Sequence, residues 1–194
     1  MPLTLEEANR VAAGAIAKAE ALGITICVAV CDTGGRLVAS LGNPSEPVYV
    51  RSCAKPFQAL ALVCSGAADA LGISEPELAT VCASHSGEPD HVSLVHSVLT
   101  RAGLTEDDLR CGVQAPFDRP ARTELAARGL EPGQLHNNCS GKHAGMLAVA
   151  RYLDLPIEDY TSPEHPVQIA IRGILGYLCG LEAEEIQSSP DGCN

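Results

Sequence analysis

Aromatic residues are scarce in this chain of 194 residues, which has no Trp, two Phe and four Tyr. Large rings therefore cannot organise the core, and small aliphatic side chains must fill it. Ala, Val, Leu and Ile supply nearly all of the hydrophobic residues, which make up 46% of the sequence against 19% charged residues. This balance is typical of a soluble globular protein and excludes a disordered chain.

Basic residues are also few: 13 Lys and Arg stand against 24 Asp and Glu, and the formal net charge is -11. Nucleic acids and anionic membranes bind clustered positive charge, so neither is an expected partner. No apolar run approaches the roughly 20 residues that span a bilayer. The first residues lack the basic and then apolar pattern of an export signal. We expect a cytoplasmic protein whose residues 1–194 form a single domain.

The cysteines also lack the even number and regular spacing of a disulfide framework: there are nine of them, irregularly spaced. Disulfides are not expected in a cytoplasmic protein. Cys27, Cys64, Cys82 and Cys179 lie in apolar segments and are predicted to be small core residues. Three other cysteines, Cys53, Cys139 and Cys193, lie in polar segments.

Helices dominate the predicted secondary structure. Thr4 and Glu7 form a capping box before a helix that ends near residue 22, with Leu5, Ala8, Val11, Ala15, Ala19 and Leu22 as its apolar stripe. A hairpin over 24–31 and 36–41 and a short strand at 48–50 follow. The later helices are expected at 54–71, 75–83, 90–102, 106–110, 119–128, 141–153 and 163–178. The fold class is thus α/β in the sense of a helix-rich α+β protein, with a sheet short of strands.

The segment from Arg51 to Pro56 contains the pattern S-x-x-K at the start of a helix. On one helical turn Ser52 and Lys55 share a face, so a lysine kept neutral by burial could take the hydroxyl proton and make the serine a nucleophile. Taken alone, the pattern favours the simpler interpretation of a capping serine beside a solvated lysine.

A second polar segment, residues 83–88, follows a helix and contains Ser84, His85, Ser86, Gly87 and Glu88. Such a turn can hold hydroxyl groups against a substrate, with His85 or Glu88 as acid or base. Taken by itself, the segment is better explained as an ordinary loop that caps the next helix.

The third segment, HNNCSGKHAGM at 136–146, carries two histidines, two asparagines, a thiol and a lysine. Cys139 and Lys142 are three residues apart at a helix start, and Cys193 lies near the C-terminus. Thiolates bind zinc, but a tetrahedral site needs about four ligands. The alternative is a helix N-terminus capped by Ser140 with a buried free thiol.

Together, RSCAKPFQA, ASHSGEPDH, HNNCSGKHAGML and DGC occur in an order that resembles the rhizobial-type, or type III, asparaginases of the asparaginase II family. The resemblance covers about residues 40–194. It implies a fold like that of serine β-lactamases and glutaminases, hydrolysis of L-asparagine to L-aspartate and ammonia, and a possible homodimer.

The resemblance also implies roles for individual residues. The catalytic residues are Ser52 with Lys55, and Ser84 as the serine of a second pair. Zinc is the implied cofactor, bound by Cys139, Lys142 and Cys193 with a water molecule. Arg51, His143 and Asp191 are the implied ligands of the substrate's α-carboxylate and α-amino groups.

Two departures from the family pattern leave alternatives open. Residues 1–39 resemble instead a haem-binding module of the GlcG or PduO type. Family members also extend past DGC and supply further strands and a second lysine, so the resemblance predicts a fold that is incomplete at the C-terminus. The alternatives are therefore a small-molecule binding module and an inactive asparaginase-like fragment.

Overall fold

The computed structural model of the chain describes residues 4–23, 28–31, 36–41, 43 and 49–189. They belong to two compact units, residues 1–49 and residues 50–194, and each unit is described by itself. The prediction of a single domain over 1–194 stays a prediction.

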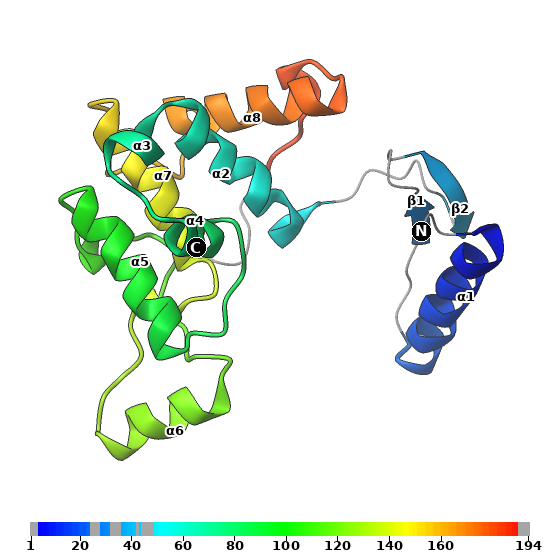
Figure 1. Cartoon of the computed structure of the whole chain (residues 1–194), viewed down its shortest axis with the longest axis horizontal. Coiled ribbons are helices and arrows are strands. Elements are labelled where there is room, and N and C mark those ends of the chain that lie inside the picture. The colour runs from blue at the N-terminus through cyan, green and yellow to red at the C-terminus, as the bar shows by residue number, and fades with distance from the viewer. Residues whose placement is uncertain (1–3, 24–27, 32–35, 42, 44–48, 190–194) are drawn as a thin grey trace. The chain divides into compact units, whose positions relative to one another are not determined.

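The first unit consists of helix α1 (Leu5–Ala21) and the antiparallel strands β1 (Val28–Cys31) and β2 (Leu37–Leu41) (Figure 1). The capping box of Thr4 and Glu7 is present, which confirms the predicted helix start. The pairing of β1 with β2 confirms the predicted hairpin over the described residues, and residues 24–27 of its first strand lie outside them. The predicted stripe is only partly right, because α1 buries Ala8, Ala12 and Ala19 and exposes Leu5, Val11 and Leu22. The residues of the hairpin turn, 32–35, lie outside the described residues.

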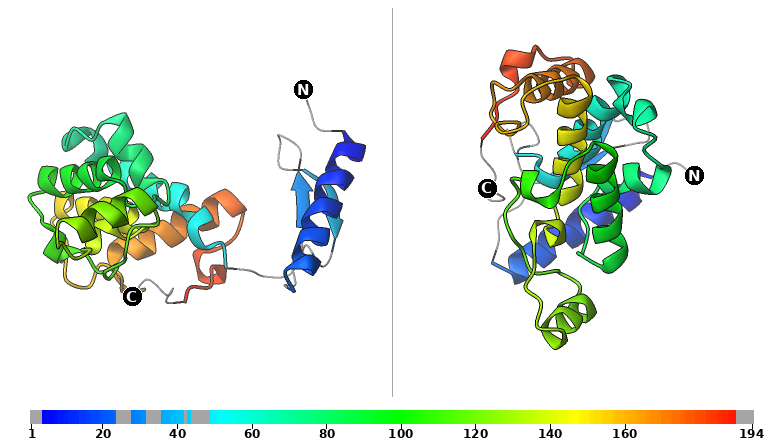
Figure 2. Two further views of the ribbon diagram at one scale, coloured as in Figure 1. Left: turned by 90° about the horizontal axis from the view of Figure 1, so that it is seen from below. Right: turned by 90° about the vertical axis from the view of Figure 1, so that its left-hand side faces the viewer.

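The second unit is built from helices alone within the described residues. Their bounds are η1 Arg51–Ala54, α2 Lys55–Cys64, α3 Ala67–Ala70, α4 Glu75–Val81, α5 Pro89–Arg101, η2 Glu106–Asp108, α6 Arg119–Ala127, η3 Gln134–His136, α7 Ser140–Tyr152, α8 Pro166–Cys179 and η4 Ala183–Glu185, where η marks a short 3-10 helix. Figure 2 shows this unit from two further directions.

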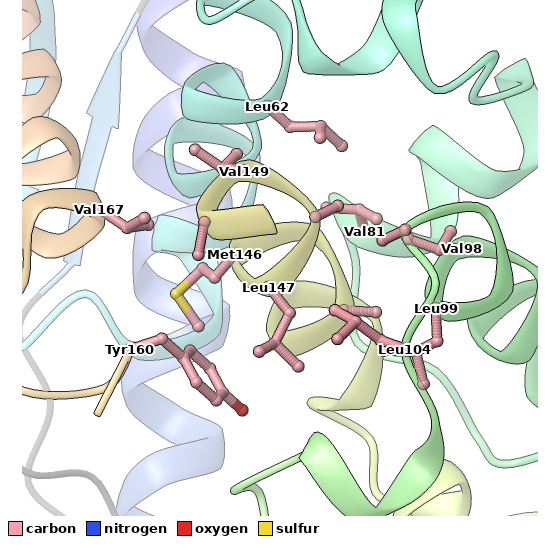
Figure 3. Packing of buried hydrophobic residues seen from close by; sticks show 14 of the residues in the cluster. Leu62, Val81, Val98, Leu99, Leu104, Met146, Leu147, Val149, Tyr160 and Val167 are labelled. Atoms are coloured by element: carbon pink, nitrogen blue, oxygen red, sulfur yellow. The ribbon is translucent and has the colours of Figure 1, made fainter. Parts of the chain in front are cut away.

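Helix α7 is the centre of the second unit. It packs against α2, α4, α5 and α8, and it is buried all round from His143 to Ala150. Side chains from the surrounding helices converge on it, among them Leu62, Val81, Val98 and Val167 (Figure 3). A helix buried on every side needs small residues where neighbours come close, and the low aromatic content of the sequence fits this aliphatic core.

Four predicted elements differ from the structure. The helix expected over 106–110 is only the single 3-10 turn η2. The helix expected over 54–71 is interrupted at Gly66, whose φ of 81° does not continue a right-handed helix. Helix α8 begins at Pro166 instead of Pro163, because the His165 side chain caps it by accepting the Val167 N–H. Tyr49 and Val50 form no strand, and Val48 lies outside the described residues.

The cysteine predictions were wrong in part. Cys64 and Cys179 are exposed, because each is the last residue of its helix and faces away from the core. Cys111 and Cys139 are buried instead. Cys27 and Cys193 lie outside the described residues.

The helix-rich character predicted from sequence is confirmed, with one two-stranded sheet among the described residues. The likeness to the β-lactamase and glutaminase fold remains a prediction. None of the described helices is both long enough and apolar enough to traverse a lipid bilayer.

Candidate active site

Ser52 and Lys55 lie on consecutive helical turns at the start of the second unit. Ser52 belongs to η1, and Lys55 is the first residue of α2, whose first turn tolerates Pro56. Ser52 is exposed, whereas Lys55 is 1% exposed. The simpler interpretation of a solvated lysine is therefore wrong, and the burial of a basic side chain requires polar partners.

Ser84 supplies the first of these partners. It follows α4 by three residues, and its Oγ accepts a hydrogen bond from Lys55 Nζ at 2.7 Å. Ser84 Oγ in turn donates to Ser52 Oγ at 3.0 Å. The structure thus brings the three predicted catalytic residues into one row, with Ser84 between the lysine and the other serine.

The second partner of Lys55 is a main-chain group that the sequence did not reveal. Lys55 Nζ donates to the carbonyl oxygen of Asn138 at 3.0 Å. The Asn138 N–H is held by Gln114 Oε1 at 3.2 Å, and Asn137 fixes the same turn through 2.7 Å and 3.2 Å bonds to the carbonyls of Cys111 and Gly112. The side chain of Asn137 and the main chain of Asn138 therefore shape the turn that holds the lysine.

The glycines of the same segment let α7 approach α4. A Cβ at Gly141 would collide with the Thr80 carbonyl oxygen, and one at Gly145 would lie 2.5 Å from Val81 Cγ1. Residues with side chains at these positions would push the helices apart. This close packing sets the position of the end of α4, from which the chain runs into Ser84.

His85 is buried next to Ser84, at 6% exposure. Its Nδ1 accepts the Gly87 N–H at 3.3 Å, and its Nε2 lies 2.9 Å from Ser140 Oγ. Burial lowers the pKa of His85 to about 4, with smaller contributions from the nearby His91, Lys55 and His136. The ring is therefore neutral at neutral pH. The other predicted acid or base, Glu88, is exposed and accepts a 2.6 Å bond from Ser86 Oγ.

His143, implied by resemblance to bind substrate, is 2% exposed and lies on α7. Its Nδ1 is 2.7 Å from the hydroxyl of Tyr160, which accepts the Arg110 N–H at 2.8 Å. The hydrogen bond between this hydroxyl and Nδ1 fixes the orientation of the His143 ring. Burial raises the pKa of Tyr160, so the phenol stays protonated. No residue pattern in the sequence indicated Tyr160.

Arg51, the other described residue with an implied substrate role, is exposed and has a φ of 47°. Left-handed backbone is unfavourable for residues other than glycine, and such strain is often found at functional sites. Here it lies immediately before Ser52. Asp191, the third implied substrate ligand, lies outside the described residues.

Two of the three implied zinc ligands are on the first turn of α7. Cys139 is the buried N-cap residue, Lys142 is half-buried, and a separation of three residues puts them on one face of the helix. The predicted cap at Ser140 was wrong, because its hydroxyl bonds the Leu135 carbonyl at 2.9 Å. Cys193 is outside the described residues, and the described His, Cys, Asp and Glu side chains form no cluster of three suited to a metal.

A pocket of about 340 Å³ lies between α5, α6 and η3, and Ser52, Lys55 and Ser84 do not line it. Val92, Leu125 and Leu135 contribute to its walls. Gly87 and His136 also line the pocket, so it adjoins the turns behind the serine row.

Comparison with known proteins yields one family. Residues 24–194 match the family described as L-asparaginase II, whereas no curated protein matches the chain. The match begins upstream of the predicted limit near residue 40 and includes the hairpin, and the GlcG-like interpretation of residues 1–39 stays a prediction. Because the match spans most of the sequence and contains the Ser52, Lys55 and Ser84 row, the chain belongs to the L-asparaginase II family.

Proposed function

We propose that this protein hydrolyses the side-chain amide of L-asparagine to L-aspartate and ammonia, with Lys55, Ser84 and Ser52 acting as one unit. The observation that carries the proposal is the row of three groups, in which Ser84 Oγ lies 2.7 Å from Lys55 Nζ and 3.0 Å from Ser52 Oγ. Membership in the L-asparaginase II family supports an amidohydrolase of the asparaginase type.

In the proposed reaction Lys55 acts as the neutral amine, the form that burial favours. It takes a proton from the serine row as a serine oxygen bonds to the amide carbon, and the carbonyl electrons move onto oxygen. The lysine ammonium then protonates the amide nitrogen, the C–N bond breaks and ammonia leaves. Water attacks the resulting ester, gives a proton to Lys55, and the serine regains its proton as the C–O bond breaks. Backbone N–H groups would stabilise the oxyanion.

The row allows either serine to attack. In either case the Ser84 hydroxyl, which donates to Ser52 in the structure, first turns to the neutral Lys55 amine. If Ser84 attacks, it then gives its proton directly to Lys55. If Ser52 attacks, its proton passes to Ser84 while the Ser84 proton passes to Lys55, so Ser84 is a relay. Both versions require Ser84, because only Ser84 lies between the other two groups.

Arg51 and His143 are proposed to bind the α-carboxylate and α-amino groups of the substrate together with Asp191. Arg51 directly precedes Ser52 and is exposed, which supports a guanidinium that meets the substrate's α-carboxylate beside the serine row. The hydrogen bond to Tyr160 fixes the orientation of the His143 ring, and a fixed orientation suits a substrate ligand.

Zinc is proposed to bind Cys139, Lys142 and Cys193. The donor set fits in one respect, since Cys139 and Lys142 share a face of α7. Lysine binds a metal only as the neutral amine, a form that a neighbouring dication favours. The ion would tie the start of α7 to the C-terminal segment. Metal analysis should give one zinc per chain, retained in Cys179→Ser and lost in Cys139→Ser; equal zinc in both variants would refute this site.

Ammonia release from L-asparagine by the purified protein tests the proposed function. Ser52→Ala and Ser84→Ala should both lose activity, whereas Ser86→Ala, in the same loop as Ser84, should keep it. A covalent adduct with the mass of an aspartyl residue, trapped at low pH and located by peptide mapping, identifies the attacking serine. A folded wild-type protein that releases no ammonia would favour the alternative of an inactive family member.

A further inference from the structure

Two turns meet behind the serine row. The first, residues 84–87, carries Ser84. The second, residues 135–140, carries the Asn138 carbonyl that holds Lys55. The His85 N–H also donates to the Asn138 oxygen, at 3.4 Å, so one carbonyl contacts both the lysine and the residue after the serine. The relative position of the two turns therefore sets the distance between Ser84 and Lys55.

The His85 ring joins the two turns. On its own turn Nδ1 accepts the Gly87 N–H at 3.3 Å, which leaves the ring proton on Nε2. Nε2–H then donates to Ser140 Oγ at 2.9 Å, and Ser140 donates to the Leu135 carbonyl at 2.9 Å. Both ring nitrogens of His85 are thus hydrogen-bonded within the protein, and the bonds require one tautomer.

Close packing also holds these two turns together, and their contact is called the junction below. Gly87 has a φ of 76°, and a Cβ there would lie 2.9 Å from the His136 carbonyl oxygen and 3.0 Å from Pro116. The 84–87 turn therefore contacts the 135–140 turn so closely at Gly87 that no side chain fits there. Glycine at 87 and the ring at 85 fix the junction from two sides.

The titratable groups around His85 oppose a positive charge on it. His91 stacks on the ring with centroids 5.3 Å apart and an interplanar angle of 22°, and Lys55 and His136 are the other nearby basic groups. A neutral ring keeps Nδ1 as an acceptor for Gly87, whereas a proton on Nδ1 would break that bond.

We propose that His85 is a positioning residue that clamps the 84–87 turn to the 135–140 turn and thereby holds Ser84 at the Lys55 amine, without itself transferring a proton. The kinetic test of this role rests on the proposed function. A second test, which needs no activity, keeps the two proposals distinguishable.

The kinetic test compares His85→Asn, His85→Gln and Ser140→Ala. Asparagine can accept the Gly87 N–H but is too short to reach Ser140, whereas glutamine can donate to Ser140. We expect His85→Asn to lower kcat about 10- to 100-fold with little change in KM, since a small misplacement of a reacting group has effects of this size. His85→Gln should restore most of kcat with the wild-type pH profile. His96→Asn, an exposed histidine on α5, is the control.

A double-mutant cycle tests the clamp itself. The losses in kcat from His85→Asn and Ser140→Ala should not multiply in the double variant, because both break the same link. Multiplying losses, a change confined to KM, or a pH limb lost in His85→Gln would overturn the proposal. Loss of thermal stability with unchanged kcat per folded molecule would also overturn it, since His85 would then be only structural.

The test without activity uses nitrogen-15 NMR of labelled histidine in the whole protein. At pH 7 the His85 signals should report a neutral ring with the proton on Nε2, and Ser140→Ala should shift its Nε2 resonance. A proton on Nδ1, or a charged ring at pH 7, would refute the clamp. If the clamp is seen but no ammonia is released, only the proposed function fails.

Discussion

Two polar clusters lie near opposite ends of helix α4, and each buries an ionisable side chain beside serines. Near the start of α4, Glu77 is 2% exposed and accepts bonds of 2.5–2.9 Å from Ser74, Ser97 and Arg101. Near its end, Lys55 is 1% exposed and reaches Ser84.

The two clusters differ in whether they reach the surface of the protein. The partners of Glu77 satisfy both carboxylate oxygens and join the N-terminus of α4 to α5, so the cluster is closed. The row from Lys55 ends in two exposed hydroxyls. A closed cluster stabilises the fold, whereas an open one can exchange a proton with a substrate. Burial of an ionisable group alone therefore does not distinguish a structural site from a chemical one.

The largest expected effect comes from Lys55→Met, which keeps the long apolar stem and removes the amine. We expect ammonia release to fall at least about 10³-fold, because the proposed reaction loses its base. Thermal unfolding should change little by comparison. Activity assays and melting curves on the same preparation check this. Unfolding of Lys55→Met together with retained activity would reverse the assignment of the two clusters.

Glu77→Ala should show the opposite behaviour. Removal of the carboxylate leaves the α4 N-terminus and Arg101 without their shared partner, and we expect a loss of about 3 kcal/mol in the free energy of unfolding. Since Glu77 lies at the far end of α4 from Ser84, kcat per folded molecule should stay close to wild type. Urea titration measures the loss, and Glu75→Ala, an exposed first-turn acid, is the matched control.

Stability should depend on pH in two separate ranges, one set by Glu77 and one by His85. Burial opposes ionisation of Glu77, but hydrogen bonds from Ser97, Ser74 and Arg101 outweigh it and lower the pKa to about 2 from 4.5. The Glu77 contribution is thus complete above pH 4.5 and is lost as the pH falls toward 2. The difference between wild type and Glu77→Gln should shrink through that window in thermal melts.

The pH range in which His85 changes the stability lies higher than that of Glu77. Its pKa in the fold is about 4 instead of 6.5, so between these values the unfolded chain binds more protons and falling pH favours unfolding. His85→Gln should therefore flatten the stability profile between pH 6.5 and 4 and leave the Glu77 window unchanged. A wild-type slope in both windows for His85→Gln would contradict the assignment.

The smallest effect concerns Arg51 and its left-handed backbone. Glycine usually costs about 1 kcal/mol relative to alanine in a helix, but at Arg51 it relieves about the same amount of strain. Arg51→Gly and Arg51→Ala should therefore agree in stability within about 0.5 kcal/mol. Ala79→Gly, at an exposed position in α4, should show the full cost. If Arg51 binds substrate, both Arg51 variants should raise KM equally.

Local chemistry explains what the sequence could predict. The capping boxes of Thr4 with Glu7 and Ser74 with Glu77 act over three residues, and both are present in the structure. The spacing of Ser52 and Lys55 likewise follows from one helical turn. These features depend on neighbours in the chain, so the residue pattern is sufficient to find them.

Contacts between distant segments could not be predicted in this way. Ser84 meets Lys55 across 29 positions, and Asn138 meets it across 83. Tyr160 reaches His143 only because α7 and the loop before α8 pack together. The break at Gly66 and the start of α8 at Pro166 were missed because competing local signals, an apolar run and an earlier proline, pointed elsewhere.

The carbonyl oxygen of Asn138 has one further consequence. Every amino acid carries such an oxygen, so an alanine scan would replace the side chain at 138 and leave the acceptor for Lys55 in place. Genetic surveys of this protein would then rank a central contact as dispensable. Only a change in the backbone itself, such as an ester in place of the peptide bond after residue 138, would weaken that acceptor.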